Sequence, residues 1–354
     1  DLDGTLIRSD TLYECFWLAL SQSWRAIPVA MNGLMGGRAE LKRRLAELTD
    51  LNAEFLPYNE EVLAYVRAWK ADGGKAVLVT AADQLLADKV AEHVGLFDEA
   101  IGSDGSTNLK GPQKARFLED RFEQTGYAYM GDSRADIPVW ESARKAIAVN
   151  APVALERQVQ AIGVDVELLN ATRKAPAYLR SLRPHQWLKN VLVFLPLMAA
   201  HAFDMMTVVN ALLAFAAFSM VSSSGYVFND LMDLRADRAH PRKSARPLAA
   251  GRVPIAHGTA LVPTLLLVGL ALALMANWQA SQSPRDCRYL YVGWALHVAH
   301  HCRWTGHRAW SFGLASGVFN VLFLCPGCGQ TPGRVGGFER PRHSDRQAAR
   351  RQRR

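Results

Sequence analysis

The chain has 354 residues and a mass of 39.1 kDa, a length that suggests two domains rather than one. Hydrophobic residues make up 49% and charged residues 21% of it, which excludes a disordered chain and a collagen-like repeat. The net charge of +8 is uneven, because segment 331–354 contains eight Arg against Glu339 and Asp345 and contributes +6 by itself. The rest of the chain is not a basic body, so we expect no nucleic-acid partner.

Residues 1–165 alternate helical patterns with short β-rich runs such as 76–80 and 128–131. This alternation is typical of an α/β domain with a parallel sheet. A mostly helical insert is expected at about 12–70. Its apolar stretch, 16–35, is compatible with two interpretations, the core of a cap or a segment that rests on a membrane.

A basic linker is expected at 166–186, and three segments nearly free of charge follow it, at 187–203, 205–228 and 254–278. A helix needs about 20 apolar residues to cross a bilayer, so we expect an all-α, multi-span membrane domain over 187–278. Lys and Arg cluster before the first segment and after the second, which places both clusters in the cytoplasm and makes the two segments a hairpin. The alternative is the helical core of a soluble protein.

Polar side chains suited to phosphate chemistry follow the predicted strands. Asp1 and Asp3 stand two residues apart, so both would point the same way at the carboxyl edge of the sheet. One carboxylate can attack phosphorus while the other handles the proton of the leaving group, with a divalent cation holding the phosphate. Later strands add Thr80 for a phosphoryl oxygen, Lys114 (or Lys110) to neutralise charge, and Asp132 and Asp136 as Mg²⁺ ligands.

Four such elements in this order resemble the haloacid dehalogenase (HAD) superfamily, which consists mainly of phosphatases. Over residues 1 to about 150, the resemblance implies an α/β HAD-like (Rossmannoid) domain with a helical cap and Mg²⁺ as cofactor. It further implies Asp1 as nucleophile, Asp3 as acid/base, Thr80 and Lys114 as phosphate clamps, and Asp132 with Asp136 as metal ligands beside Asp1 and Asp3. The alternatives are Asp residues that only cap turns and a HAD fold without turnover.

The chain opens directly in this motif and without Met. We therefore expect a clipped start that lacks the central strand before Asp1, which puts the activity of this chain in doubt.

A second group of carboxylates stands where the second apolar segment ends. Asn229, Asp233 and Asp237 recur every four residues, so a helix would carry them on one face, with Asp230 beside them. Acidic groups stacked at the end of a membrane helix repel one another unless cations lie between them, and Mg²⁺ bridging them to a diphosphate is the natural chemistry. The alternative is a solvated loop. Further positive charge for phosphate oxygens comes from Lys243 and Arg246.

This pattern, together with 183–190 (Arg-Pro-His-Gln-Trp-Leu-Lys-Asn), resembles the UbiA-type prenyltransferase superfamily over about 178–278, and within it the decaprenyl-phosphate phosphoribosyltransferase subgroup. That subgroup transfers phosphoribose from phosphoribosyl diphosphate to a polyprenyl phosphate. The resemblance implies that the acidic motif holds Mg²⁺-diphosphate and that Lys189, Asn190 and Arg246 contact phosphates. The alternative is an aromatic-acceptor prenyltransferase with a prenyl diphosphate donor, in which the HAD domain is a non-catalytic scaffold or regulatory module.

Residues 279–354 lack the further spans and the second Asp-rich motif that this superfamily needs, and they are rich in His, Cys, Trp and Arg. We interpret them as a frameshifted tail, because codons read one base later allow apolar, membrane-like runs. A zinc site at Cys325 and Cys328 and a basic RNA-binding tail are the alternatives. We therefore expect no transferase activity from the chain as written.

The sequence thus predicts a bifunctional protein of the inner membrane, multi-pass, with its HAD domain in the cytoplasm. Its expected partners are a polyprenyl phosphate or diphosphate lipid, a phosphorylated small molecule such as phosphoribosyl diphosphate, and the membrane.

Overall fold

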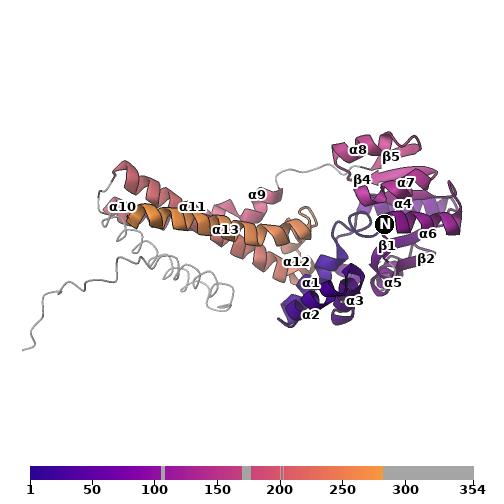
Figure 1. Ribbon diagram of the computed structural model, residues 1–354, viewed down its shortest axis with the longest axis horizontal. Helices are drawn as coiled ribbons and strands as arrows, with labels where there is room; N and C mark the ends of the chain where they lie inside the picture. The colour runs from indigo at the N-terminus through magenta and orange to yellow at the C-terminus, as the bar shows by residue number, and fades with distance from the viewer. Residues whose placement is uncertain (105–107, 170–176, 200, 202, 282–354) are drawn as a thin grey trace, which may run out of the picture.

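The structure is a computed structural model that describes residues 1–104, 108–169, 177–199, 201 and 203–281 (Figure 1). The predictions made for the tail from residue 282 onward, including Cys325 and Cys328, lie outside the described residues. Within them, an α/β domain is joined to a pair of long helices (Figure 1).

The described part of the α/β domain contains five parallel strands in two sheets. One sheet pairs β1 (Val77–Asp83) with β2 (Glu99–Ser103), and the other has the order β3 (Ala128–Gly131), β4 (Lys145–Val149), β5 (Asp165–Leu169). The α/β class with parallel pairing is confirmed. The described strands do not join into the single sheet that was expected.

The first residues of the chain lie between the two sheets. The backbone nitrogen of Asp1 donates to the carbonyl of Met130 in β3 at 3.0 Å. Leu2 is fully buried in the same hydrophobic cluster as Leu78 and Ala82 of β1. Asp1 is therefore held at the carboxyl end of β3, as its predicted role requires.

Helices cover these sheets and form the insert. The insert contains α1 (Thr11–Gln22), α2 (Ala26–Met35), α3 (Arg38–Leu48), the 3-10 turn η1 (Ala53–Phe55) and α4 (Glu60–Ala71). The remaining helices of the domain are α5 (Gln84–Val94), α6 (Pro112–Phe122), η2 (Arg134–Asp136), α7 (Ile137–Ser142) and α8 (Val153–Gln160). Ile7 forms isolated bridges with Asp3 and Tyr58, so the chain leaves and re-enters the domain at one place.

The C-terminal part is helical in all its described elements. They are α9 (Ala177–Leu182), η3 (Pro184–Phe194), α10 (Leu195–Ala199), α11 (Met205–Met232), α12 (Leu234–Ala239), η4 (Lys243–Ala245) and α13 (Ile255–Ser281). The long helices α11 and α13 lie side by side (Figure 1). Their backbones approach closely at Gly269, where a Cβ would lie 2.6 Å from Cγ2 of Val221.

Two helices of the described chain are long and apolar enough to cross a membrane, Met205–Met232 and Ile255–Ala276, with mean hydropathies of 1.8 and 2.3. The first predicted span, 187–203, is not one helix: the 3-10 helix η3 ends at Phe194 and the five-residue α10 follows it. Pro196 lies in the first turn of α10, the place in a helix where the missing N–H of proline costs no hydrogen bond. A multi-span domain remains a prediction.

Candidate active sites

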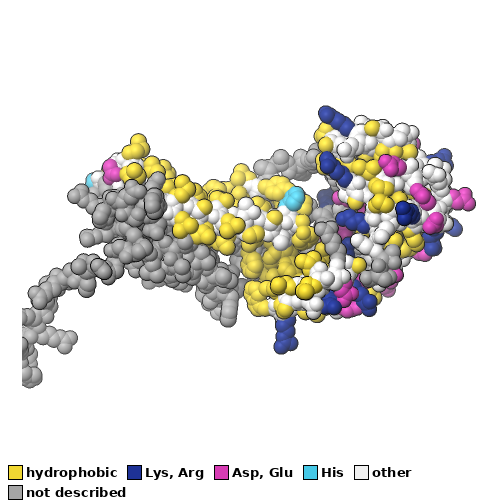
Figure 2. Space-filling model, viewed as in Figure 1, with side chains coloured by type: hydrophobic (Ala, Val, Ile, Leu, Met, Phe, Trp, Pro, Cys, Tyr) yellow, Lys and Arg dark blue, Asp and Glu magenta, His cyan; other side chains and the backbone are white. Residues whose placement is uncertain are grey.

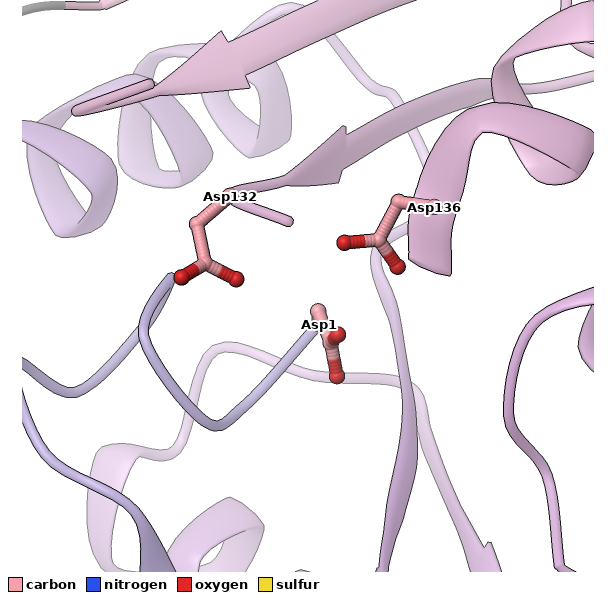
Figure 3. Close-up of side chains that lie close together, drawn as sticks. All are labelled: Asp1, Asp132 and Asp136. Carbon is pink, nitrogen blue, oxygen red and sulfur yellow. The ribbon is translucent and has the colours of Figure 1, made fainter. Parts of the chain in front are cut away.

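Three carboxylates converge at the carboxyl end of β3. One ligand oxygen from each of Asp1, Asp132 and Asp136 lies within 4.8 Å of the others. Asp132 follows β3 directly, and Asp136 closes the turn η2, where Ser133 caps it through its backbone and hydroxyl groups. Figure 3 shows the three side chains turned toward one shared space. Three close oxygen ligands are the donor set that Mg²⁺ takes.

Two glycines allow this convergence. Gly4 has a φ of +75°, and a Cβ on it would collide with the carboxylate of Asp132. A Cβ on Gly131 would lie 2.8 Å from Cγ of Asp136. The space that these carboxylates occupy therefore exists only because both positions lack a side chain.

Lys114 supplies positive charge to the cluster. Its Nζ lies 3.1 Å from Oδ2 of Asp1 and 3.9 Å from Oδ1 of Asp136, and it donates to the hydroxyl of Tyr129 at 2.8 Å. The side chain is 2% exposed, whereas Lys110, the alternative clamp, is exposed. Burial lowers the pKa of Lys114, and the nearby carboxylate of Asp136 opposes that shift.

Burial and repulsion from a neighbouring carboxylate favour the protonated form of Asp132. Burial, and next the charge of Asp136, raises the pKa of Asp132 to about 7. A bound cation would remove this repulsion. The carboxylates therefore fit Mg²⁺, and the electrostatics of the site favour a cation among them.

Asp3 and Thr80, two further predicted site residues, form hydrogen bonds with groups outside the three-carboxylate cluster. Asp3 accepts hydrogen bonds from the backbone nitrogen of Thr11 at 2.8 Å and from its hydroxyl at 3.2 Å, at the start of α1. Burial raises the pKa of Asp3 to about 6. Thr80 is fully buried, and its hydroxyl accepts a hydrogen bond from the nitrogen of Ala82 at 3.0 Å. The three-carboxylate group does not include Asp3, which was a predicted ligand.

Two side chains at this site were not anticipated. Tyr129 is buried and links Lys114 to Asp136, to which its hydroxyl donates at 3.1 Å. Lys42 reaches from α3 to the carbonyl of Ala81 at 2.6 Å and carries the positive charge felt by Asp3. A tyrosine inside a strand and a lysine inside a charged helix leave no signal in sequence, because only the fold brings them to the site.

A second charged cluster lies where α11 meets α12. The guanidinium of Arg246 bridges two buried carboxylates, 3.1 Å from Oδ1 of Asp230 and in close contact with Oδ2 of Asp237. Arg183 forms a short ion pair with the same oxygen of Asp230. Arg183 stood in the quoted motif but was not among the predicted site residues. Each guanidinium has N–H groups beyond those in these ion pairs, and such groups bind phosphate oxygens.

The other residues predicted for this second site lie on α11, α12, η3 and the loop after α12. The helix is interrupted at Asp233, between α11 and α12. The backbone nitrogen of Asp233 nevertheless donates to the carbonyl of Asn229 at 2.9 Å, and the backbone nitrogen of Asp237 donates to the carbonyl of Asp233 at 2.8 Å. The three motif residues thus stay on successive turns. Asn190 is buried and donates to Ser219 at 3.1 Å.

Lys189 belongs to η3, and its side chain is half-buried. The ammonium of Lys243 lies 3.9 Å from Oδ1 of Asp237.

That Oδ1 of Asp237 is buried and has no hydrogen-bond partner among the described atoms. A buried carboxylate oxygen without a donor is unfavourable, and a cation closer than the ammonium of Lys243 would satisfy it. The acidic motif therefore also fits Mg²⁺.

Comparison with known families agrees with the two sites. The family described as haloacid dehalogenase-like hydrolase matches residues 1–141, and the UbiA prenyltransferase family matches residues 190–282. The chain therefore joins a HAD-like region to a UbiA-family region, and the predicted resemblance to both is confirmed.

Three relatives illustrate these matches. The uncharacterized protein y4nM of Sinorhizobium fredii is 40% identical over 79% of this chain and 54% of its own length. The decaprenyl-phosphate phosphoribosyltransferase of Corynebacterium glutamicum is 37% identical over 29% of this chain and 32% of its own length. Protoheme IX farnesyltransferase 1 of Paramagnetospirillum magneticum is 36% identical over 31% of this chain and 38% of its own length. The chain thus spans about half or less of the length of each of these relatives.

Proposed function

We propose that residues 1–165 form a Mg²⁺-dependent phosphohydrolase that cleaves a phosphate monoester. The observation that carries this proposal is the convergence of Asp1, Asp132 and Asp136, with the buried ammonium of Lys114 at 3.1 Å from Asp1. Bound Mg²⁺ would supply the positive charge that brings a phosphoryl group among the carboxylates.

The roles of the residues follow from the HAD resemblance. The carboxylate of Asp1 attacks phosphorus and forms an aspartyl phosphate, while the ester oxygen leaves with a proton from Asp3. Water then cleaves the acyl phosphate, and Asp3 accepts its proton. A carboxyl whose pKa burial raises to about 6 can give and take a proton near neutral pH. Lys114 and Thr80 hold the phosphoryl oxygens.

The test is phosphate release from a panel of small phosphate esters by the purified full chain with Mg²⁺. Asp132→Asn should lower the rate by about 10²-fold or more, because it removes a carboxylate of the metal site. Asp120→Asn, an exposed position on α6, is the matched control and should keep the full rate. Equal rates for the two variants would contradict the proposal, as would the absence of any release.

We infer a second function for residues 187–278, a transfer reaction that involves a polyprenyl phosphate and requires Mg²⁺. Its support is the pairing of Asp230 and Asp237 with Arg183 and Arg246 at the end of an apolar helix. The proposed donor is phosphoribosyl diphosphate and the proposed acceptor a polyprenyl phosphate. The similarity to the decaprenyl-phosphate phosphoribosyltransferase of Corynebacterium glutamicum favours this choice.

An aromatic-acceptor prenyltransferase with a non-catalytic HAD module is the alternative, favoured by the similarity to a protoheme farnesyltransferase. Measuring substrate binding distinguishes the two proposed transfer reactions better than measuring turnover. The chain matches only 32% and 38% of the lengths of the two relatives, and a binding test does not require a complete transferase site. With Mg²⁺, the reconstituted chain should bind phosphoribosyl diphosphate more tightly than farnesyl diphosphate. The reverse order would favour the alternative.

The proposed location is the inner membrane, with α11 and α13 spanning it and the HAD domain in the cytoplasm. The loop between these helices is rich in Lys and Arg, at positions 235, 238, 242, 243, 246 and 252. It lies at the end of the helix pair where the HAD domain is also found (Figure 1). Positive loops stay on the cytoplasmic side.

A further inference from the structure

In the insert, helix α2 and the turn before it expose their large apolar side chains. Trp24 of the turn and Ile27, Met31, Leu34 and Met35 of the helix are between 39% and 90% exposed. At roughly 100° per residue, they fall on one stripe about 100° wide along the helix. Five large apolar side chains on one exposed stripe are unusual for a helix that faces water.

The opposite side of α2 is made of small residues. Ala26 and Gly33 are buried and Ala30 is partly buried. Gly33 lies so close to α3 that a Cβ there would stand 3.0 Å from Cα of Leu41. A helix of a water-soluble domain places its large apolar residues inward, whereas a helix in contact with lipid packs small residues against its neighbours. The pattern of α2 is the second kind.

The preceding helix, α1, brings α2 to the end of the two apolar helices. The indole nitrogen of Trp17 donates to the hydroxyl of Thr259 at 2.8 Å, and its ring packs edge-on against Phe228 with centroids 5.7 Å apart. Phe228 lies about one turn before the end of α11, and Thr259 about one turn after the start of α13. Trp17 is thus at the depth where a bilayer's headgroup region would lie. Only three residues separate α1 from α2.

The charge around α2 suits a lipid surface. Between Glu14 and Glu40 the chain has no acidic residue, and its charged residues there are Arg25 and Arg38. In Figure 2 the surface over α1 and α2 is largely hydrophobic and adjoins that of the helix pair. A Trp and an Arg at the start of an apolar helix are common where a helix lies in the interface, and Arg is attracted to anionic headgroups.

We propose that α2 is an interfacial helix whose apolar stripe lies in the surface of the same bilayer that α11 and α13 span. This goes beyond the two proposed reactions and depends only on the proposed membrane placement of α11 and α13. It assigns the stripe to lipid, so the insert of the HAD domain is attached to the membrane surface beside the second acidic site.

The test measures the surroundings of single cysteines in the full chain reconstituted into vesicles of phosphatidylcholine and phosphatidylglycerol. Met31→Cys reports on the stripe. Val153→Cys, an exposed apolar position on α8, is the matched control for water, and Leu267→Cys, exposed on α13, reports on the span. Cysteines 287, 302, 325 and 328 are replaced by Ser. Cys15 stays, because it is buried and burial raises the pKa of its thiol to about 12.

Each cysteine carries a nitroxide, and its collisions with oxygen and with a water-soluble nickel chelate are measured. We expect the chelate to reach position 31 several-fold less often than position 153, and oxygen to reach it more often. Free access of the chelate to position 31, with position 267 protected, would overturn the inference and leave the membrane placement intact. Exclusion of both reagents from position 31 would show that protein covers the stripe, which also overturns it. Free access to position 267 would contradict the membrane placement itself.

Discussion

Glu14 of α1 and Arg238 of α12 form a two-point ion pair, with Oε2–Nη1 and Oε1–Nη2 distances of 2.9 and 2.7 Å. The two side chains are 4% and 8% exposed, and Nε of Arg238 also donates to the carbonyl of Ala249. Arg238 is the neighbour of Asp237 in the acidic motif. Thr11, three residues before Glu14 in the first turn of α1, donates its backbone N–H to Asp3. Helix α1 therefore contacts Asp3 of the first predicted site and Arg238, the sequence neighbour of Asp237 in the second.

This ion pair leads to the first prediction. Glu14→Gln leaves Arg238 buried without its counter-charge, and breaking a buried pair from one side costs about 3–5 kcal/mol. We expect the insert to detach from α12, which limited proteolysis between α1 and α3 would detect. The matched control is Glu40→Gln, which removes a partly exposed pair with Arg44 inside α3 and should cost less than about 1 kcal/mol. Equal protection of the two variants would show that the pair does not hold the insert.

The second prediction concerns the cation of the first site. Lys114→Met removes the buried ammonium beside Asp1, so phosphate release should fall by about 10²-fold or more. Lys110→Met removes an exposed charge four residues earlier and should retain most of the rate. Rates of phosphate release with Mg²⁺ check both variants. A larger loss in Lys110→Met than in Lys114→Met would assign the clamp to Lys110.

The third prediction follows from the raised pKa values of Asp132, about 7, and Asp3, about 6. Because the folded state binds these protons more tightly than the unfolded state, the stability that these two groups contribute is largest in acid and is lost as the pH rises from about 4 to about 7. The buried amine of Asp1, whose pKa burial lowers to about 5, acts in the opposite direction between about pH 5 and 8, so the unmodified chain is compared with Asp132→Asn. Without metal, Asp132→Asn should gain melting temperature relative to the unmodified chain over about pH 4 to 7 and should melt at the higher temperature at pH 8.

Mg²⁺ provides the control for this experiment. It binds the ionised carboxylates, so it should raise the melting temperature of the unmodified chain at pH 8 by more than that of Asp132→Asn. Tryptophan fluorescence during heating measures both. If the melting temperature of metal-free Asp132→Asn does not rise relative to that of the unmodified chain between about pH 4 and 7, the assigned protonation is wrong.

The fourth prediction separates the two sites. Asp237→Asn removes a carboxylate that Arg246 bridges and whose Oδ1 has no donor among the described atoms. Binding of Mg²⁺-diphosphate to the reconstituted chain should weaken by at least about tenfold, while phosphate release stays unchanged. Asp204→Asn is the matched control: it removes the negative charge at the far end of α11 but keeps an oxygen that can cap Thr207, costs less than about 1 kcal/mol of stability and should leave binding intact. Loss of both activities in Asp237→Asn would contradict separate sites.

Much of the architecture was predictable from local patterns. The alternation of apolar runs predicted an α/β domain, and the lengths of two charge-free runs predicted α11 and α13, because burial and bilayer thickness act on every residue of such a run. The segment 187–203 was wrong as one helix, because its apolar composition does not distinguish the 3-10 helix η3, which ends at Phe194, from the α-helix α10, which begins at Leu195. The choice between Lys114 and Lys110 also needed the structure. Lys110 stands just before the predicted helix and Lys114 in its first turn, so the sequence places both near the phosphate.

The sequence by itself determined the chemistry at each site: carboxylates two or four residues apart, with Lys and Arg placed to neutralise them. Only the tertiary structure decided which of these groups meet. Tyr129 and Lys42 reach the first site, Arg246 bridges Asp230 and Asp237, and Glu14 pairs with Arg238 across 224 positions. Such contacts depend on the packing of whole helices and strands, which no local spacing encodes. The apolar stretch 16–35 shows the same division, because its composition fits either a core or a membrane and only the fold shows which side of α2 is exposed.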